Sequence, residues 1–276
     1  MSWCAVDVRS PGDSRDAVAS WLVGRTGQAV EERDDGTLVG FSETEAAAQR
    51  LLGDLQARFG TTVHARARAL PDVDWSARWR DGLAPRPIGR LTVTPSWLAA
   101  GSAPESSVII DPESAFGTGE HGSTRSALVL LDRHLQPGDR VLDLGSGSGI
   151  LTIAAAKLGA ERATGVELDD EADPIAVANA RRNGVEDRVR FIIGDAAALA
   201  PLLGPADLIL SNILRSVNLT LLPSIRASLR PGGLAIFAGM ELPEREQFLP
   251  ALSAAGFDPV DEVVDEGWWA VAARGR

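Results

Sequence analysis

The stretch that decides the fold is VLDLGSGSGI, residues 141–150. A short apolar run leads into three glycines, at positions 145, 147 and 149, which alternate with serines. Glycines at a strand-to-helix turn let a ligand lie close to the backbone, although the same glycines can serve the turn alone. The stretch therefore predicts a strand, a binding loop and a helix, and it leaves open which ligand the loop holds.

Strand and helix patterns repeat on both sides of this loop. Apolar runs predict strands at 140–144, 163–167, 189–193, 206–211 and 234–239, with helices at 150–158, 174–183, 217–229 and 244–255. Residues 257–274 hold two more strands around the turn DEG, which should end the sheet antiparallel. We therefore predict a doubly wound α/β fold, in which a mostly parallel, seven-stranded, Rossmann-like sheet carries helices on both faces.

The first 70 residues show a separate pattern. Apolar and polar residues alternate in WCAVDV (3–8) and in TTVHARARAL (61–70), and two apolar helix stripes lie between them. This order predicts a small ferredoxin-like α/β domain over residues 1–70. Residues 71–106 are irregular and interrupted by prolines, so we expect a linker there. The predicted catalytic domain then spans residues 107–276.

Composition narrows the classes of function. The chain has 276 residues, is 45% hydrophobic, and has no apolar run near the roughly 20 residues of a membrane span. The single cysteine, Cys4, and the absence of a signal-peptide pattern fit a reducing cytoplasm. Net charge is −11 and no basic stripe is present, which argues against direct nucleic-acid binding. A protein or a small molecule is left as substrate, and we expect no metal site.

The charges around the loop favour one ligand. The glycines do not follow the G-x-G-x-x-G spacing of dinucleotide loops, and a Walker lysine is absent. Asp143 would repel a pyrophosphate but suits a positively charged ligand, and Glu167, which ends the next strand, could bind a ribose diol. S-adenosylmethionine carries a ribose, an ammonium and a sulfonium, and it matches better than NAD. Asp195 could accept from the adenine amino group or cap the following turn.

Several motifs carry a resemblance to a known family. VLDLGSGSG, GVEL, GDA and LRPGG resemble the successive landmarks of class I methyltransferases. DWSARWRDGLAPRPIGRLTVTPSW, DPESAFGTGEHGSTR and SNIL resemble the ribosomal protein methyltransferase family PrmA, over residues 72–274. That resemblance implies S-adenosylmethionine as cofactor and protein eleven of the large ribosomal subunit, free or in the ribosome, as partner. It implies cofactor contacts at Thr124, Gly145, Glu167 and Asn212, and we expect a further one at Gly147 of the glycine loop.

This chain departs from the family pattern at three places, one of which is Pro174, early in a predicted helix where the family has no proline. His121-Gly122-Ser123-Thr124 stands where members commonly show His-x-Thr-Thr, and Ala238-Gly239-Met240 stands where they often show Ser-Gly-Ile. The resemblance therefore supports the cofactor end of the site more strongly than the substrate end.

The resemblance implies a simple reaction. The sulfonium already makes the methyl group electrophilic, so the protein has to hold a neutral amine in line with it. The Asn212 side-chain oxygen could accept from that amine, or the residue could merely end a strand. His121 could relay a proton or orient its loop. The expected acceptors are lysine or N-terminal amino groups, and we expect residues 1–70 to recognise the substrate.

Three more functions remain open on the sequence. The same core could methylate another protein or a small molecule, because the core does not encode its substrate. The chain could also be an NAD-dependent oxidoreductase, or a module that binds ribosomal protein without transferring methyl groups.

Overall fold

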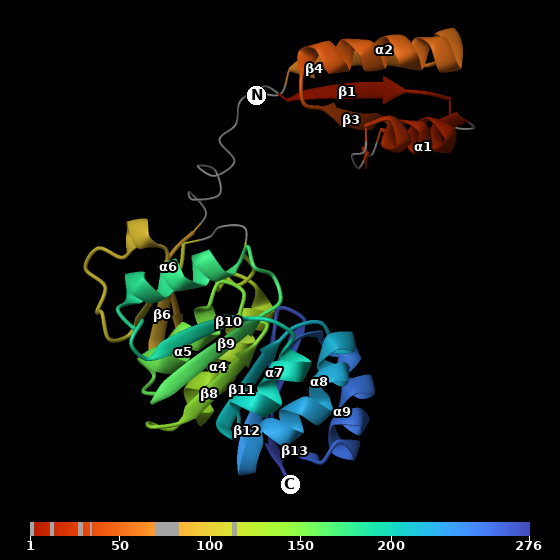
Figure 1. The fold of residues 1–276 in the computed structure, drawn as a ribbon. Coiled ribbons are helices and arrows are strands. Elements are labelled where there is room, and N and C mark those ends of the chain that lie inside the picture. The colour runs from red at the N-terminus through yellow and green to blue at the C-terminus, as the bar shows by residue number, and fades with distance from the viewer. Residues whose placement is uncertain (1–2, 12–13, 27–29, 34, 70–82, 112–114) are drawn as a thin grey trace. The chain divides into compact units, whose positions relative to one another are not determined.

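The computed structural model of the 276-residue chain describes residues 3–11, 14–26, 30–33, 35–69, 83–111 and 115–276. Contacts divide the chain into two units, Met1–Gly82 and Leu83–Arg276 (Figure 1), and each is described by itself. The domain boundaries expected from the sequence stay a prediction, with residues 71–82 of the expected linker outside the described residues.

The N-terminal unit is a four-stranded antiparallel sheet with two helices. Its elements are β1 (Cys4–Arg9), α1 (Arg15–Thr26), β2 (Glu31–Glu32), β3 (Leu38–Ser42), α2 (Glu45–Phe59) and β4 (His64–Ala69), with a 3₁₀ turn, η2 (Gly60–Thr62), before β4. The strand order β2-β3-β1-β4 is that of a ferredoxin-like domain. One core joins Val6 and Val8 of β1 to residues of both helices, so both helices cover one face. The sequence pattern misses β2, because two glutamates show no apolar alternation.

The C-terminal unit is built on a seven-stranded sheet, as predicted. Its strands run in the order β10-β9-β8-β11-β12-β14-β13. They are β8 (Arg140–Leu144), β9 (Arg162–Glu167), β10 (Val189–Ile193), β11 (Ala206–Asn212), β12 (Leu229–Glu241), β13 (Phe257–Asp265) and β14 (Trp268–Gly275). All neighbours are parallel except β12–β14 and β13–β14, so the antiparallel end of the sheet is confirmed.

Helices cover both faces of this sheet. One core cluster joins the sheet to α4 (Gly122–His134), α5 (Ile150–Lys157) and α6 (Asp173–Asn183). The other joins it to α7 (Ala196–Leu203), α8 (Arg215–Ser228) and α9 (Arg245–Ala254), which follows a 3₁₀ turn, η4 (Leu242–Glu244). Sequence patterns did not predict α4 or α7. The first turn of α4 is polar yet buried, and α7 is uniformly apolar, so neither has the alternating faces of a surface helix.

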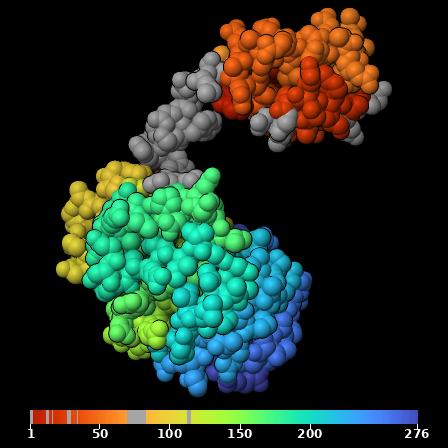
Figure 2. All heavy atoms as spheres, in the orientation of Figure 1, coloured from red at the N-terminus to blue at the C-terminus, as the bar shows by residue number. Residues whose placement is uncertain are grey.

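Residues 83–111 form a small sheet of their own, although most of them were expected in the linker. The elements are β5 (Arg86–Ile88), β6 (Leu91–Thr94), η3 (Ser96–Leu98) and β7 (Ser107–Ile109). Leu91, Val93 and Val108 are buried in the core shared with α4 and α5. Figure 2 shows this segment, in yellow, packed directly against the rest of the unit. The strands are too short for their alternation to appear between prolines. Among the described residues, no helix is long and apolar enough to cross a membrane.

Candidate functional site

A pocket of about 450 Å³ lies at the carboxyl ends of the parallel strands of the C-terminal unit. The chain order reverses between β8 and β11, which is where open α/β sheets bind their ligands. Gly145 and Gly147 line the pocket from the loop after β8, and Glu167 lines it from the end of β9. Asn212, Ile213 and Leu214 lie at the end of β11 and just beyond it, and a further group comes from elsewhere in the chain: Phe116, His121, Ser123, Val217, Gly239 and Trp268.

The loop after β8 needs its glycines. Gly145 and Gly147 have φ angles of +79° and +50°, which side-chain-bearing residues rarely adopt. A Cβ on Gly147 would lie 2.6 Å from the Phe116 carbonyl oxygen, and one on Gly145 would lie 2.6 Å from Ile213 Cγ2. The Ser148 amide donates to the Phe116 carbonyl at 2.9 Å, so the segment containing Phe116 lies against the loop. The backbone here is both strained for other residues and tightly enclosed.

Glu167 is held at the edge of the pocket by backbone amides. Its Oε2 accepts from the Gly147 amide at 2.8 Å, and its Oε1 accepts from Leu168 and Asp169 at 2.8 and 3.1 Å. The carboxylate therefore ties the end of β9 to the glycine loop. It is half-buried and lines the pocket, so its remaining lone pairs can accept from hydroxyl groups of a ligand.

Asp143 does not have the role expected from the sequence. Its side chain is only 1% exposed, and its Oδ2 accepts from the Thr152 amide at 3.0 Å and the Thr152 hydroxyl at 2.7 Å. Burial raises the pKa of Asp143 to about 7, against the lowering effect of the Thr152 bonds. The residue tethers β8 to α5 behind the pocket. Asp143 therefore gives no support for a positively charged ligand.

Asn212 lines the pocket and has an acceptor without a partner in the described part of the chain. Its Nδ2 donates to Thr124 Oγ1 at 3.2 Å, while its Oδ1 is buried and has no hydrogen-bond partner within the described part of the chain. A buried carbonyl oxygen left without a donor costs about 1–3 kcal/mol, which a ligand donor would recover. Thr124 itself is fully buried and lies behind Asn212 rather than on the pocket surface.

The turn that carries Asn212 is fixed by a neighbouring side chain. Asn218 of α8 donates from Nδ2 to the carbonyls of Ile213 and Ala238, both at 3.0 Å. The Ser211 hydroxyl donates to Asn218 Oδ1 at 2.7 Å. Because Asn218 is completely buried, these bonds hold the end of β11 against β12. Asn218 was not among the predicted site residues, although a polar side chain inside an otherwise apolar helix face could have signalled it.

Three aromatic rings form one wall of the pocket, which we call the aromatic wall: Phe116, His121 and Trp268. The centroid of the His121 ring lies 4.2 Å from the ring centroid of Trp268 and 5.4 Å from that of Phe116. His121 Nδ1 is hydrogen-bonded to Ser123 Oγ at 2.7 Å. Burial, and then the charge of Arg125, hold the pKa of His121 below its ordinary value, so the neutral ring is favoured at neutral pH.

Phe116 and Trp268 were not identified from the sequence. A cue was present for Trp268, because adjacent residues of a strand face opposite sides. Trp269 fills the core and is fully buried, which directs Trp268 to the other side.

Asp195 lies away from the pocket lining. It is exposed, precedes α7, and accepts from the Ala197 amide at 2.8 Å as the helix cap. Of its two expected roles, the cap is the one whose bond is present. No group of three metal-ligating side chains occurs among the described residues.

Comparison with known proteins places the chain in a family. The family model described as "Ribosomal protein L11 methyltransferase (PrmA)" matches residues 18–276. The chain belongs to this family. A ribosomal protein L11 methyltransferase of Thermus thermophilus is 44% identical over 205 residues, which is 74% of this chain and 78% of that protein. One of Pelotomaculum thermopropionicum is 31% identical and covers 99% of both chains.

A solved structure agrees with this assignment. The crystal structure of ribosomal protein L11 methylase from Lactobacillus delbrueckii subsp. bulgaricus is 30% identical, with a TM-score of 0.61. The match covers 68% of this chain and 96% of that one.

Proposed function

We propose that this pocket transfers methyl groups to lysine or N-terminal amino groups of ribosomal protein L11, and that Asn212 orients the amine. As a member of the PrmA family, the chain is an S-adenosylmethionine-dependent methyltransferase that acts on L11. The observation that carries the finer proposal is the buried, unpartnered Oδ1 of Asn212 at the pocket, within the described part of the chain. We place the activity in the cytoplasm because its substrate is a ribosomal protein.

The pocket residues fit the cofactor. At Gly145 and Gly147 a ligand can approach the backbone where a side chain would obstruct it. Glu167 is aimed at the pocket by the Gly147 amide and can accept from a ribose diol. When bound, S-adenosylmethionine supplies an electrophilic methyl group on its sulfonium. S-adenosylmethionine has no phosphate, so the carboxylate of Glu167 beside the glycine loop does not repel it.

The protein's own residues then act on the amine. A neutral amine that donates one N–H to Asn212 Oδ1 has its lone pair free for the methyl group, and correct alignment lowers the barrier to transfer. Thr124 keeps the Asn212 amide from rotating, because its hydroxyl accepts from Nδ2. Neutral His121 can take up the proton that the methylated amine releases.

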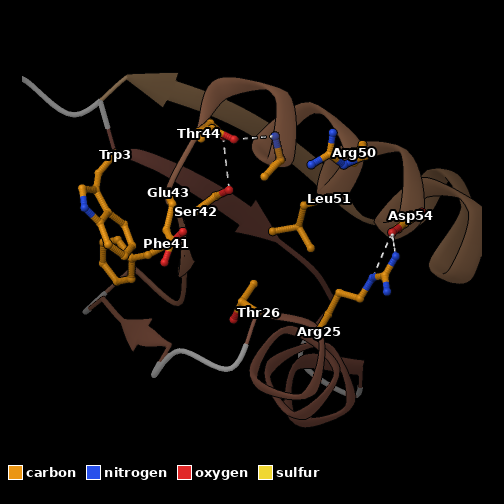
Figure 3. Close-up of a pocket in the computed structure, with 11 residues that line it drawn as sticks. Trp3, Arg25, Thr26, Phe41, Ser42, Glu43, Thr44, Arg50, Leu51 and Asp54 are labelled. Atoms are coloured by element: carbon orange, nitrogen blue, oxygen red, sulfur yellow. Dashed lines mark hydrogen bonds and ion pairs between the residues drawn. The ribbon is translucent and has the colours of Figure 1, made fainter. Parts of the chain in front are cut away.

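We further propose that the N-terminal unit recognises L11. It carries none of the cofactor residues and has a core of its own. A pocket of about 460 Å³ lies between the end of α1 and the start of α2. Figure 3 shows Trp3 and Phe41 at one end of it and the Arg25–Asp54 ion pair, 2.5 Å between Nη2 and Oδ2, at the other. An aromatic shelf beside charged groups suits a folded protein partner.

Mass spectrometry of L11 tests the proposal. L11 incubated with the full chain and a deuterated-methyl cofactor should gain label on lysine side chains or the N-terminal amine. Label on another residue type would contradict the amine assignment. A fragment spanning residues 83–276 should still bind S-adenosylhomocysteine and should label L11 poorly. Full activity of a folded fragment would refute recognition by the N-terminal unit.

A further inference from the structure

We propose that Arg125 is a positioning residue, which locks the β13–β14 turn onto the start of α4 and so sets the aromatic wall beside Asn212. The proposal rests on the proposed function, because it assigns the amine to that side of the pocket. We call the contact of Arg125 with the turn residues Asp265 and Glu266 the latch.

Arg125 makes the latch from a nearly buried position in the first turn of α4. Its side chain is only 9% exposed. Its Nε donates to Asp265 Oδ2 at 2.5 Å, and its Nη2 forms an ion pair with Glu266 Oε2 at 2.7 Å. Its Nη1 donates to the Glu120 carbonyl. A planar guanidinium with donors on three sides can hold both carboxylates and the backbone at once, which a lysine cannot.

The turn carries backbone strain at the residue that Arg125 holds. Glu266 has a φ of +48° and is the one non-glycine residue with positive φ in the described ranges. Glycine would adopt this conformation without strain. Glu266 is also 74% exposed, so packing does not require its side chain. Compared with glycine, glutamate adds a carboxylate that pairs with Arg125. Because the backbone strain is retained at an exposed residue, we infer that this ion pair has a role.

The turn also touches the helix directly. A Cβ on Gly122, the first residue of α4, would lie 2.7 Å from the Asp265 carbonyl oxygen and 2.8 Å from Trp268 Cδ1. The absence of a side chain at this position therefore lets the turn and Trp268 sit against the helix start. The latch and this close approach therefore both fix the β13–β14 turn against the first turn of α4.

This region carries the residues on the side of the pocket that we propose for the amine, which we call the amine end. His121 directly precedes α4, and its ring centroid lies 4.2 Å from that of Trp268, which begins β14 directly after the turn. Thr124, next to Arg125 in the chain, accepts from Asn212. Loosening the latch should thus displace Trp268 relative to Asn212. The latch bonds of Arg125 do not involve Glu167 or the glycine loop, so cofactor binding should be spared.

The chain offers a matched control on the same two elements. Arg133, near the other end of α4, pairs with Asp261 of β13 at 3.2 Å, and its side chain is 52% exposed. Arg133→Ala therefore removes an α4–β13 ion pair that lies outside the pocket lining.

The experiment compares full-length Arg125→Ala, Arg125→Lys, Glu266→Asn and Arg133→Ala. Asparagine tolerates positive φ, so Glu266→Asn removes the charge without adding strain. We would measure kcat and KM on L11, calorimetric affinity for S-adenosylhomocysteine, and the ¹⁹F resonance of fluorotryptophan at 268, assigned with Trp268→Phe. Arg125→Ala should lower kcat/KM by about 10- to 100-fold and shift the resonance, with cofactor affinity within about twofold. Glu266→Asn and Arg125→Lys should act less strongly in the same direction, and Arg133→Ala should act on neither readout.

The latch is refuted if Arg125→Ala leaves turnover and the resonance unchanged, if Arg133→Ala acts equally, or if cofactor affinity falls in parallel with turnover. If Arg125→Ala fails to fold, Glu266→Asn and Glu266→Gly test the latch in its place. Both change an exposed side chain, and Glu266→Gly also relieves backbone strain, so a lower turnover without lower stability supports the latch. A wild-type chain that transfers no methyl to L11 would contradict the proposed function instead, and the Trp268 resonance would still decide the latch.

Discussion

The two ends of the pocket, which we propose to hold the cofactor and the amine, are built in different ways. At the cofactor end, Gly145 and Gly147 follow β8, Glu167 ends the adjacent β9, and the Gly147 amide joins them at 2.8 Å. At the amine end, Asn212 ends β11, His121 directly precedes α4 and Trp268 begins β14, so the sequence separations are far larger. The cofactor end depends on local backbone conformation, whereas the amine end depends on the packing of distant segments. Substitutions should therefore separate cofactor affinity from turnover.

The largest effect is expected at the amine end. Asn212→Ala removes the Oδ1 acceptor and leaves the Thr124 hydroxyl without its donor. We expect turnover on L11, at saturating cofactor, to fall by about a hundredfold or more, because misalignment of the amine is that costly. Initial rates of label transfer measure it. Thr124→Val is the companion variant and should show a smaller fall. An unchanged rate for Asn212→Ala would show that the residue only ends its strand.

At the cofactor end, the expected effect is on affinity. Glu167→Ala should weaken binding of S-adenosylhomocysteine by about 1.5–3 kcal/mol, the value of a hydrogen bond to a charged group. Loss of the carboxylate also frees the Gly147 amide, which acts in the same direction. Calorimetry gives the value, and Glu167→Gln, which keeps an acceptor, should fall between. Unaltered affinity in Glu167→Ala would refute the ribose assignment.

The free energy of unfolding should depend on pH through Asp143, which lies next to the glycine loop. Its pKa is raised to about 7 in the folded chain, so the unfolded chain ionises first as pH rises. The stabilisation that the protonated Asp143 gives the folded chain is complete below the ordinary pKa of the carboxyl group, and it is lost as pH rises to about 7. Relative to Asp143→Asn, the wild type should lose about 2–3 kcal/mol between pH 5 and pH 8, by urea unfolding. A constant difference across that range would contradict the raised pKa.

The smallest effect is expected at Asp195, which does not line the pocket. Asp195→Ala removes the cap of α7 and should cost about 1 kcal/mol of stability. Asp195→Ser keeps a capping oxygen and should restore most of it, as thermal unfolding would show. If the cap is the only role, both variants bind S-adenosylhomocysteine like the wild type. A weaker affinity in both would instead support contact with the adenine amino group.

The contrast between the two ends also explains what could be predicted from sequence. Apolar runs mark the strands around Gly145 and Glu167, and the alternation of strands with helices indicates a parallel sheet. Arg125 carries no such local signal, because its role arises only where the β13–β14 turn meets α4. Asp143 shows the opposite error, since its place beside the loop suggested a ligand contact, whereas its side chain is buried and bonded to Thr152.

The separation of the two ends is tested by the affinity of Asn212→Ala for S-adenosylhomocysteine, measured by calorimetry beside Glu167→Ala. Asn212 lines the same pocket, and the family resemblance also implies a cofactor contact there. If the two ends are separable, the affinity of Asn212→Ala stays within about threefold of the wild type while its turnover collapses. An affinity loss as large as that of Glu167→Ala would show that Asn212 holds the cofactor, and would contradict its assignment to the amine.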